Sequence, residues 1–422
     1  MKRVIVVGAG ASGLMAAGRA AAQGAEVRVL EKMHRPGLKL GLTGKGRCNL
    51  TNTAPEEEFL SRFGRQGRFL RKAFAGFDNR ALVEFFREQG IETAEERGGR
   101  VFPVEGGALA VRDALVRWAR RQGVVVRSRR RVCRILLQDG RAVGVEAEAL
   151  TARDQDCPRR TQEIGDAVVL AAGGASYPST GSSGEGYRQA AEAGHTVIPV
   201  QPGLVPLETG EDVAARLDGL ALRNVGVRLL VDGRKKAREF GEMEFTGFGV
   251  SGPVVLTLSC PAVRSLGAGG EVQLSVDLKP ALGEQKLDAR LRRDLRQRGA
   301  ESLSSILRGL MPGRLIPVCL EQTGLAGERK GAHLNAGERK RLKLWLKDFR
   351  LRVTGSRPFS EAIISLGGVD LREVHPETLQ SRLVPGLYFC GEVLDLAAET
   401  GGFNLQAAFS TGWLAGTSAA RS

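Results

Sequence analysis

The N-terminal stretch that ends at Glu31 carries the pattern that most constrains the fold. A β-branched run, RVIVV, is followed by the glycine-rich turn GAGASG, an alanine-rich stretch, and a second apolar run, EVRVLE, that ends in Glu31. A strand, a glycine turn, a helix and a second strand in this order form a βαβ unit. The glycines give the spacing G-x-G-x-x-G directly after the first strand, so we predict a Rossmann-like domain at the N-terminus.

Each residue of this motif has a physical reason. Gly8 permits the tight turn, Gly10 admits a pyrophosphate against the backbone, and Gly13 lets helix and strand pack closely. Glu31 follows at the end of the second strand, where a carboxylate accepts both hydroxyls of a ribose and disfavours a 2′-phosphate. The helix N-terminus supplies amides and a partial positive charge for the phosphates. The motif therefore predicts a bound dinucleotide, and by itself it fits both FAD and NAD.

Two later segments repeat the order of strand, glycine-rich loop and helix. The first is GDAVVLAAGGASYPSTGSSGEGYRQAAEAGH, in which a helix is expected from about Glu185. The second is GLYFCGEVLDLAAETGGFNLQAAFSTGWLAGTSAA, near the C-terminus, where an acid in the loop can hold a ribityl chain. A chain that begins and ends at one ligand suits a long two-ended cofactor such as FAD better than NAD.

The middle of the chain has a different texture, with short strands and turn signals followed by a helical region. We predict the α/β class and four segments: the N-terminal part of the cofactor domain (1–195), a β-rich insert (196–280), a small helical part (281–355) and the C-terminal part of the cofactor domain (356–422). The stretch AGERKRLKLWLKDFRLRV is basic and amphipathic and contains Trp345. Contact with RNA or an anionic membrane is one interpretation, and docking of its apolar stripe on its own domain is the favoured one.

Composition and charge argue against several other classes. The 422 residues have a formal charge of +15 and a pI near 10.0, but arginines are scattered along the whole length, so a nucleic-acid partner is not expected. No segment has the apolar length of a membrane span. No C-x-x-C pair or His grouping suggests a metal site, and the widely spaced thiols predict a cytoplasmic location. The cysteines are Cys48, Cys133, Cys157, Cys260, Cys319 and Cys390.

Several blocks of the sequence together carry a family resemblance. The chain resembles the bacterial flavoproteins of the aminoacetone oxidase family, also described as NAD(P)/FAD-dependent oxidoreductases, which includes a proposed reductase of oxo bile acids. The resemblance implies a glutathione-reductase-type FAD domain built from both termini, interrupted by a β-barrel-like part and a small helical part. The blocks are GAGASGLMAA, TGKGRCNLTN, AAGGASYPSTGSSGEGY, GLVPLE, EFTGFGVSGP and GEVLDLAAETGGFNLQAAFSTGWLAG.

The motif and the resemblance together give an expected set of cofactor-binding residues. In the family, the loop matching Gly44 to Asn49 approaches the flavin ring, Asp395 would hold the ribityl hydroxyls, and Val132 would offer its backbone to adenine. The residues after Gly401 would place amides near the flavin pyrimidine. The full set is Gly8, Gly10, Ala11, Ser12, Gly13, Glu31, Lys32, Lys39, Gly44, Lys45, Gly46, Arg47, Cys48, Asn49, Val132, Ala172, Gly173, Gly174, Gly391, Glu392, Asp395, Gly401, Gly402, Phe403 and Asn404.

Three positions in these blocks raise questions of their own. Many members of the family have Gly or Asn where this chain has Lys45, and many have His where it has Gly247. A cation at Lys45 either stabilises the anionic reduced flavin or points to solvent, and the sequence favours neither. Cys48 is either redox active or a buried inert thiol, and the second interpretation is favoured because no other cysteine is near in sequence.

The predicted function is that of an FAD-dependent oxidoreductase, in which the flavin does the hydride chemistry on a small organic substrate. No catalytic acid or base identifies itself, and the second redox partner is either oxygen or NADH or NADPH acting directly at the flavin. The substrate is expected between the cofactor domain and the insert, near Tyr177, Phe248 and Ser251. The alternatives are an RNA-binding flavoprotein that acts on or near tRNA and a non-catalytic flavin-binding regulator.

Overall fold

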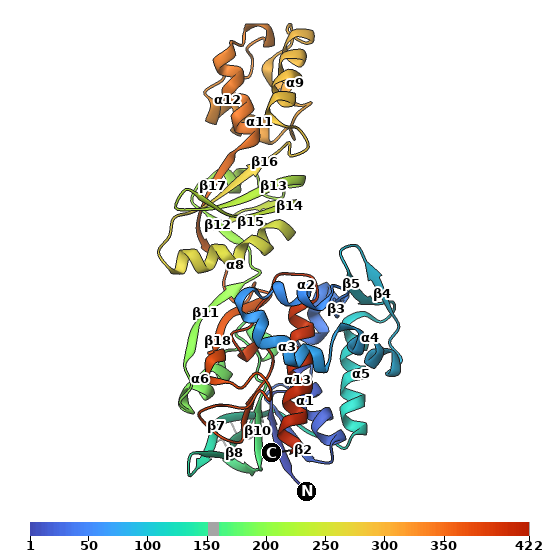
Figure 1. The fold of residues 1–422 in the computed structure, drawn as a ribbon. Coiled ribbons are helices and arrows are strands. Elements are labelled where there is room, and N and C mark those ends of the chain that lie inside the picture. The colour runs from blue at the N-terminus through green and yellow to red at the C-terminus, as the bar shows by residue number, and fades with distance from the viewer. Residues whose placement is uncertain (151–159, 422) are drawn as a thin grey trace. The chain divides into compact units, whose positions relative to one another are not determined.

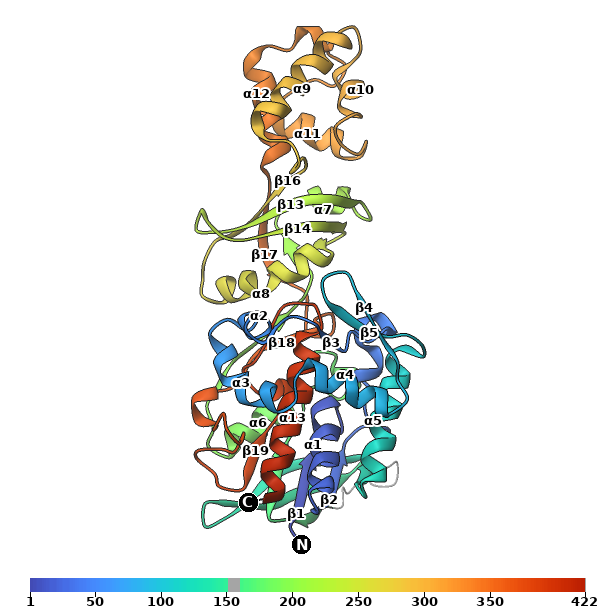
Figure 2. The ribbon, with the colours of Figure 1, turned by 45° about the vertical axis from the view of Figure 1, so that its right-hand side comes forward.

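The computed structural model describes residues 1–150 and 160–421, which form two compact units. Unit 1 consists of Met1–Pro202 and Phe359–Ser422, and unit 2 is Gly203–Pro358. Figure 1 and Figure 2 show both units in colours that follow the chain. Cys157 lies outside the described residues, and the other five cysteines form no disulfide with one another. The α/β fold class predicted from the sequence is confirmed, with a Rossmann-type domain at its centre.

Unit 1 is built on a parallel five-stranded sheet in the order β19-β10-β1-β2-β6. In β1, Val4 and Val6 enter the hydrophobic cluster on one face, whereas Ile5 and Val7 enter the cluster on the other. Burial on both faces explains the unbroken apolar run of this strand, as is usual for parallel sheets. The strands are β1 (Arg3–Val7), β2 (Glu26–Glu31), β6 (Val125–Ser128), β10 (Ala167–Leu170) and β19 (Leu387–Phe389).

One face of this sheet is covered by three long helices, α1 (Ala11–Ala22), α5 (Gly107–Arg121) and α13 (Phe403–Arg421). The first and last of them, α1 and α13, lie side by side although they come from opposite ends of the chain (Figure 1). A Cβ on Gly412 or Gly416 would lie within 2.4 Å of a carbonyl oxygen of α1. The small residues of the C-terminal helix therefore allow its close contact with α1.

The rest of unit 1 supplies the other face and the loops around the sheet. The hydrophobic cluster on the second face includes residues of the antiparallel sheet β7-β8-β9. Its strands are β7 (Arg130–Gln138), β8 (Arg141–Ala149) and β9 (Arg160–Ile164). The remaining elements are η1 (Leu40–Gly46), β3 (Thr51–Asn52), α2 (Glu56–Ser61), η2 (Gly64–Gln66), α3 (Gly67–Gly76), α4 (Asn79–Glu88), β4 (Thr93–Glu96), β5 (Arg100–Pro103), η3 (Pro178–Thr180), α6 (Glu185–Glu192), β11 (Val197–Gly203), β18 (Ile364–Val369), η5 (Leu371–Glu373) and η6 (Gly391–Val393).

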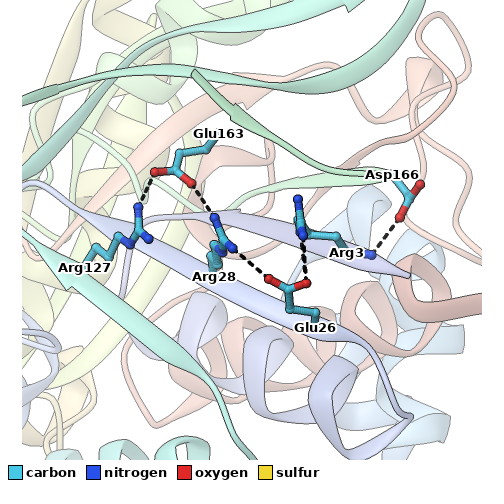
Figure 3. Close-up of polar contacts among 6 residues, drawn as sticks. All are labelled: Arg3, Glu26, Arg28, Arg127, Glu163 and Asp166. Atoms are coloured by element: carbon cyan, nitrogen blue, oxygen red, sulfur yellow. Dashed lines mark hydrogen bonds and ion pairs between the residues drawn. The ribbon is translucent and has the colours of Figure 1, made fainter. Parts of the chain in front are cut away.

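A charged network joins the parallel sheet to the antiparallel one (Figure 3). The Glu163 carboxylate on β9 accepts from Arg28 at 3.1 Å and also from Arg127, and Arg28 bridges on to Glu26 at 2.9 Å. Hydrogen bonding to Arg3 lowers the pKa of Glu26 below its usual value. The stabilisation from that carboxylate is therefore present above its unfolded pKa and is lost as the pH falls through its folded pKa.

Replacing Glu163 by Gln should lower the free energy of unfolding by about 2 kcal/mol. The substitution removes a mostly buried carboxylate, so that Arg28 and Arg127 lose their negatively charged partner. Denaturant unfolding of the purified protein measures this. The control is Glu56→Gln, which removes an exposed ion pair with Arg71 at 3.9 Å and should cost less than about 0.5 kcal/mol. Equal effects of the two substitutions would show that the network does not join the sheets energetically.

Unit 2 contains a closed barrel in the order β12-β15-β14-β13-β16-β17. Its strands are β12 (Leu207–Thr209), β13 (Ala221–Val231), β14 (Arg234–Thr246), β15 (Gly249–Ser251), β16 (Val272–Asp277) and β17 (Phe349–Ser356). Its helices are α7 (Val213–Arg216), α8 (Pro253–Gly267), α9 (Glu284–Gln297), α10 (Leu303–Leu307), α11 (Leu315–Thr323) and α12 (Ala336–Lys347). The four helices α9 to α12 follow one another between the two strands β16 and β17.

Two expectations about the segment bounds are wrong. The insert was expected to begin at residue 196, but the strand β11 pairs with β18 and belongs to unit 1 as far as Pro202. The expected helical part contains β17, which closes the barrel. The signal for this strand is the alternation FRLRV, in which Phe349, Leu351 and Val353 are buried and the two arginines are exposed. A basic helix directly before it concealed the change of period.

The basic helix α12 packs within its own unit. Trp345 is 8% exposed, its indole N–H donates to the Gln322 side chain at 2.8 Å, and its ring lies 4.8 Å from that of Phe349. Leu342 and Leu346 are buried on the same side of the helix. These contacts agree with the favoured interpretation, in which the apolar stripe of the helix docks on its own domain. Trp345 is therefore not available to stack on a nucleic acid. No helix among the described residues is long and apolar enough to cross a membrane.

Candidate functional site

The carboxyl ends of four neighbouring strands carry expected cofactor residues. Gly8 follows β1, Glu31 ends β2, Ala172 to Gly174 follow β10, and Gly391 and Glu392 follow β19. These strands are neighbours in the order β19-β10-β1-β2, and parallel strands end at the same edge of a sheet. Segments from opposite ends of the sequence therefore meet at one edge.

The glycine turn has the geometry that a pyrophosphate requires. A Cβ on Gly8, whose φ is +97°, would lie 2.6 Å from the Ala171 carbonyl oxygen, and a Cβ on Gly13 would lie 2.0 Å from the Gly8 carbonyl oxygen. A Cβ on Gly10, in contrast, would meet no atom within 4 Å. The first and third glycines are needed by the protein itself, whereas the second borders open space at the N-terminus of α1.

Glu31 lies beside this turn and is 9% exposed. Its two carboxylate oxygens accept from the backbone N–H groups of Ala9 at 2.7 Å and Met33 at 2.8 Å. Burial raises the pKa of Glu31, although both hydrogen bonds act in the opposite direction. Each carboxylate oxygen has a second lone pair, so the side chain is positioned by the backbone and retains the capacity to accept the hydroxyls of a ribose.

The loop from Gly44 to Asn49 has an unusual backbone. Gly44, Lys45 and Gly46 have φ values of +60°, +55° and +86°, and Cys48 follows with +61°. Left-handed conformation at two residues with side chains costs free energy and is concentrated at functional sites. Lys45 is exposed, and Arg47 lies over the Phe102 ring at 4.3 Å and pairs with Glu96. The loop thus turns its backbone sharply while Arg47 is held by neighbours.

This loop is joined to the start of the last helix. In the amide orientation that satisfies both groups, the Asn49 side-chain oxygen accepts from Gly402 N–H at 3.1 Å and its nitrogen donates to the Thr51 carbonyl at 3.0 Å. A Cβ on Gly402 would lie 2.3 Å from that same Thr51 oxygen. Asn404, in the first turn of α13, holds the preceding loop through both its amide atoms, each 2.8 Å from the backbone of Ala398. The two segments expected around the flavin ring are therefore neighbours.

A polar cluster connects the ends of β10 and β19. The Lys39 ammonium lies 2.6 Å from both Glu392 and Ser176, and Glu392 also accepts from the Ser176 hydroxyl and the Ser365 N–H. A Cβ on Gly174 would lie 2.5 Å from the Ser365 hydroxyl oxygen. Sequence reasoning missed the two serines. Ser176 lies in the block AAGGASYPSTGSSGEGY, which carries part of the family resemblance. No local pattern distinguishes Ser365, since its role comes from packing beside a strand that is distant in the sequence.

The other expected residues lie around the same edge. Ser12 is buried, and its hydroxyl donates weakly, at 3.5 Å, to the Cys390 carbonyl beside Gly391. Lys32 binds Ser183 and lies 3.2 Å from Glu185, so the strand β2 is tied to the loop after β10.

Val132 was expected to offer its backbone to adenine. It is buried, and its carbonyl accepts from the Gln189 amide at 2.6 Å. A β-bulge follows at Cys133. One lone pair of the Val132 carbonyl is therefore already used by the protein, and its contact with adenine stays a prediction.

The expected substrate residues lie in different units. Tyr177, with a φ of +55°, belongs to unit 1, and its N–H donates to the Phe359 carbonyl. Phe248 and Ser251 belong to the barrel of unit 2, where the Arg357 guanidinium lies 4.4 Å from the Phe248 ring centroid. Their participation in one substrate cleft stays a prediction. No group of three or more metal-ligating side chains exists among the described residues.

Cys48 should be chemically inert in the native protein. Its side chain has no exposed surface, and burial raises the pKa of its thiol to about 11. At pH 8 alkylation of Cys48 by iodoacetamide should therefore be about 100-fold slower than in the unfolded chain, because the thiolate is the reactive form. Mass spectrometry of the labelled peptides measures this, with the partly exposed Cys260 as internal reference. Rapid labelling of native Cys48 would restore the redox interpretation.

The residues present at this edge fit FAD. The open space at Gly10 borders a helix N-terminus for the pyrophosphate, and the buried Glu31 carboxylate suits a ribose. The loop that contains Lys45 and the N-terminus of α13 lie together, where the ring system of a two-ended cofactor would be held. A mononucleotide would not need so many segments of the chain, so the arrangement suits a longer cofactor.

A family model and several known proteins match nearly the whole chain. The family model described as the HI0933-like protein Rossmann domain matches residues 2–418. The 3-dehydro-bile acid delta(4,6)-reductase of Clostridium scindens is 33% identical over 100% of this chain and 99% of its own length. The ribosomal RNA dihydrouridine synthase of Escherichia coli is 30% identical over 97% of this chain and 96% of its own, and that of Haemophilus influenzae is 27% identical over 99% and 98%.

Solved structures show the same fold at low sequence identity. The 3-ketosteroid-delta4-(5alpha)-dehydrogenase of Rhodococcus jostii has a TM-score of 0.54 and 16% identity, with coverage of 100% of this chain and 97% of its own. The 3-ketosteroid delta1-dehydrogenase of Sterolibacterium denitrificans also has a TM-score of 0.54, with 13% identity and full coverage of both chains.

Proposed function

Because this chain belongs to the HI0933-like Rossmann family and is an FAD-dependent oxidoreductase, we propose that it reduces a carbon–carbon double bond conjugated to a carbonyl group, with NADH or NADPH as the electron donor. The family membership confirms the resemblance to the aminoacetone oxidase family that the sequence motifs indicated. A non-catalytic regulator is not supported, since the curated relatives have the names of enzymes.

The single observation that carries the proposal is the agreement between two relatives with unlike substrates. The first is a reductase of delta(4,6) double bonds in a 3-dehydro bile acid, and the second makes dihydrouridine in ribosomal RNA. In both molecules the double bond that becomes saturated is conjugated to a carbonyl group. The carbonyl activates such a bond toward hydride, so one flavin site serves both. This chain, which is similar to both relatives over nearly its full length, is expected to share that reaction.

The chain's own residues supply binding and orientation. When bound, FAD supplies the hydride-transfer chemistry. Gly10 and the N-terminus of α1 would bind the pyrophosphate and Glu31 a ribose, and Asp395 would hold the ribityl chain. The backbone of the loop around Lys45 and the amides at the start of α13 would fix the ring and favour negative charge on it. The source of the proton that completes the reduction is not among the residues assigned to these roles.

The direction of the reaction favours a pyridine nucleotide over oxygen as the second redox partner. Saturation of one double bond takes up two electrons and two protons, so NADH or NADPH must give a hydride and solvent a proton. The spacing G-x-G-x-x-G occurs at the N-terminus and again at Gly247, Gly249 and Gly252, but the strands around the second occurrence belong to the antiparallel barrel. Only the first lies in a parallel βαβ unit, and FAD would use it. The donor would therefore bind transiently at the flavin face, as expected of an enzyme without a dedicated nicotinamide domain.

The test follows the visible spectrum of the FAD-loaded protein without oxygen while NADH or NADPH is added. Bleaching of the oxidised flavin, followed by its return when a 4-en-3-one steroid is added, supports the proposal. The saturated ketone should appear in equal amount to the flavin reoxidised. A flavin that is bleached by neither nucleotide, or one that the conjugated ketone and ribosomal RNA both fail to reoxidise, contradicts it.

A second candidate concerns the substrate rather than the chemistry, and it is a uracil base in ribosomal RNA. The observation that favours it is the dihydrouridine synthase activity named for two full-length relatives. Incubation of unmodified ribosomal RNA with the FAD-loaded protein and NADPH should then produce dihydrouridine, as measured by mass spectrometry of the nucleosides. If the protein reduces the steroid but forms no dihydrouridine, the substrate is a small molecule rather than ribosomal RNA.

A further inference from the structure

We infer that the outer face of the barrel in unit 2 binds an unpaired segment of RNA. A base would stack on Phe240, and the surrounding arginines and lysines would hold the phosphates. The inference deepens the proposed function by naming the partner that would bring the double bond to the flavin. It rests on that function only for its biological meaning, because binding is measured separately from reduction.

Phe240 is an aromatic ring without a structural role in the core. It is 60% exposed on β14, whereas its neighbours on the inner face of the barrel, such as Met243 and Phe245, are buried. Its partner across the strands is Gly226, which has no side chain to cover the ring. An exposed ring beside a glycine on a sheet is the arrangement on which unpaired bases stack, at a gain of about 1–3 kcal/mol per base.

A row of arginines lies directly beside this ring. Strand register pairs Arg238 with Arg228, Arg228 with Ser275, and Ser275 with Arg350, so one row crosses β14, β13, β16 and β17. The residues between them along each strand point inward and are buried, as Val227, Leu274 and Leu351 show. The row therefore belongs to the outer face, where Arg238 and Arg350 are exposed.

The next row continues the positive charge. Lys235 pairs with Leu230, Leu230 with Gln273, and Gln273 with Arg352, and the exposed Lys236 lies at the β-bulge between the two rows. Two of the acids near these rows are engaged, since Asp348 binds Arg228 and Arg350, and Asp277 binds Lys347. On the other side of Phe240 along β14, Glu242 and Glu244 are exposed on the same face, and Glu242 lies 3.9 Å from Arg223. Most of the exposed cations at the start of β14 are thus left to face solvent.

The charge of the whole chain is concentrated in this unit. Between residues 203 and 358 the sequence has 27 Lys and Arg against 18 Asp and Glu, an excess of nine out of the total of +15. Most of that excess lies between residues 282 and 347, where the segment with α9 to α12 has 15 Lys and Arg against 7 Asp and Glu, whereas the barrel residues 203–281 and 348–358 have 12 against 11. The strand register nevertheless places Arg238, Arg228 and Arg350 in one row beside an exposed aromatic ring. Phosphates need the cations and a base needs the ring, so RNA fits both, whereas an anionic membrane would use only the charge.

The test measures binding of the full-length, FAD-loaded protein to a labelled single-stranded oligouridylate and to protein-free ribosomal RNA, over a range of salt concentrations. Phe240→Ala should weaken binding about 10-fold at every salt concentration, and Phe240→Tyr should restore it, because both rings stack. The double variant Lys236→Glu and Arg238→Glu should also weaken binding and should reduce the slope of log affinity against log salt by about 1.4.

The matched control is Arg117→Glu with Arg120→Glu, which makes the same charge change on the exposed side of α5 in unit 1. It should leave the affinity within about 2-fold, and all variants should keep their flavin. The inference is overturned if the protein does not bind RNA at moderate salt, if the control weakens binding as much as the β14 variants, or if Phe240 mediates only self-association or retention on anionic vesicles. Steroid reduction unchanged in Phe240→Ala would show that a failed binding test leaves the proposed function intact.

Discussion

Gly10→Val should give a folded, colourless protein. A Cβ on Gly10 would meet no protein atom within 4 Å, and its φ of −78° and ψ of −170° are open to any residue. The fold therefore tolerates the valine, but the pyrophosphate must approach the backbone at this point. FAD affinity should fall at least 100-fold, as measured by quenching of FAD fluorescence on titration with the apoprotein. Far-UV circular dichroism should be unchanged.

The comparison is with Gly13→Ala, further along the same turn. A Cβ there would lie 2.0 Å from the Gly8 carbonyl oxygen, so strand and helix must separate, and we expect loss of soluble folded protein. One substitution should thus remove the cofactor alone and the other the fold. If Gly10→Val retained FAD at the affinity of the original protein, the pyrophosphate would have to lie elsewhere.

Glu31→Arg should also abolish FAD binding, by a different route. The carboxylate accepts two backbone hydrogen bonds and would accept two more from a ribose, whereas a guanidinium accepts none. Loss of charged hydrogen bonds to the ribose corresponds to at least 100-fold in FAD affinity, since each is worth about 1.5–3 kcal/mol. Isothermal titration of the apoprotein with FAD gives the value directly.

Two further variants separate the role of Glu31 from general damage. Glu31→Gln keeps one acceptor oxygen and should lose about 10-fold. Glu26→Gln, at the partly exposed start of the same strand, should leave FAD affinity unchanged although it breaks ion pairs with Arg3 and Arg28. If Glu31→Arg bound FAD normally, the adenosine end of the cofactor would not lie at the end of β2.

Short-range patterns predicted the N-terminal βαβ unit and its glycine roles. A strand alternates every two residues, a helix repeats every 3.6, and a glycine turn has a fixed spacing, so all three are readable within about 30 residues. The same reasoning placed the strand, loop and helix near the C-terminus. It was wrong about β17, because the two-residue alternation from Phe349 to Val353 follows a helix without a turn signal.

By itself, the sequence determined that the chain starts with a dinucleotide-binding unit, and its motifs identified the family. Only the tertiary structure decided which distant residues meet, such as Lys39 with Glu392 and Asn49 with Gly402 at the cofactor edge, and Ser275 with Arg350 on the barrel. The physical reason is that local patterns depend on spacing along the chain, whereas these contacts depend on strand order and register, which form only when segments far apart in the sequence pack into one sheet.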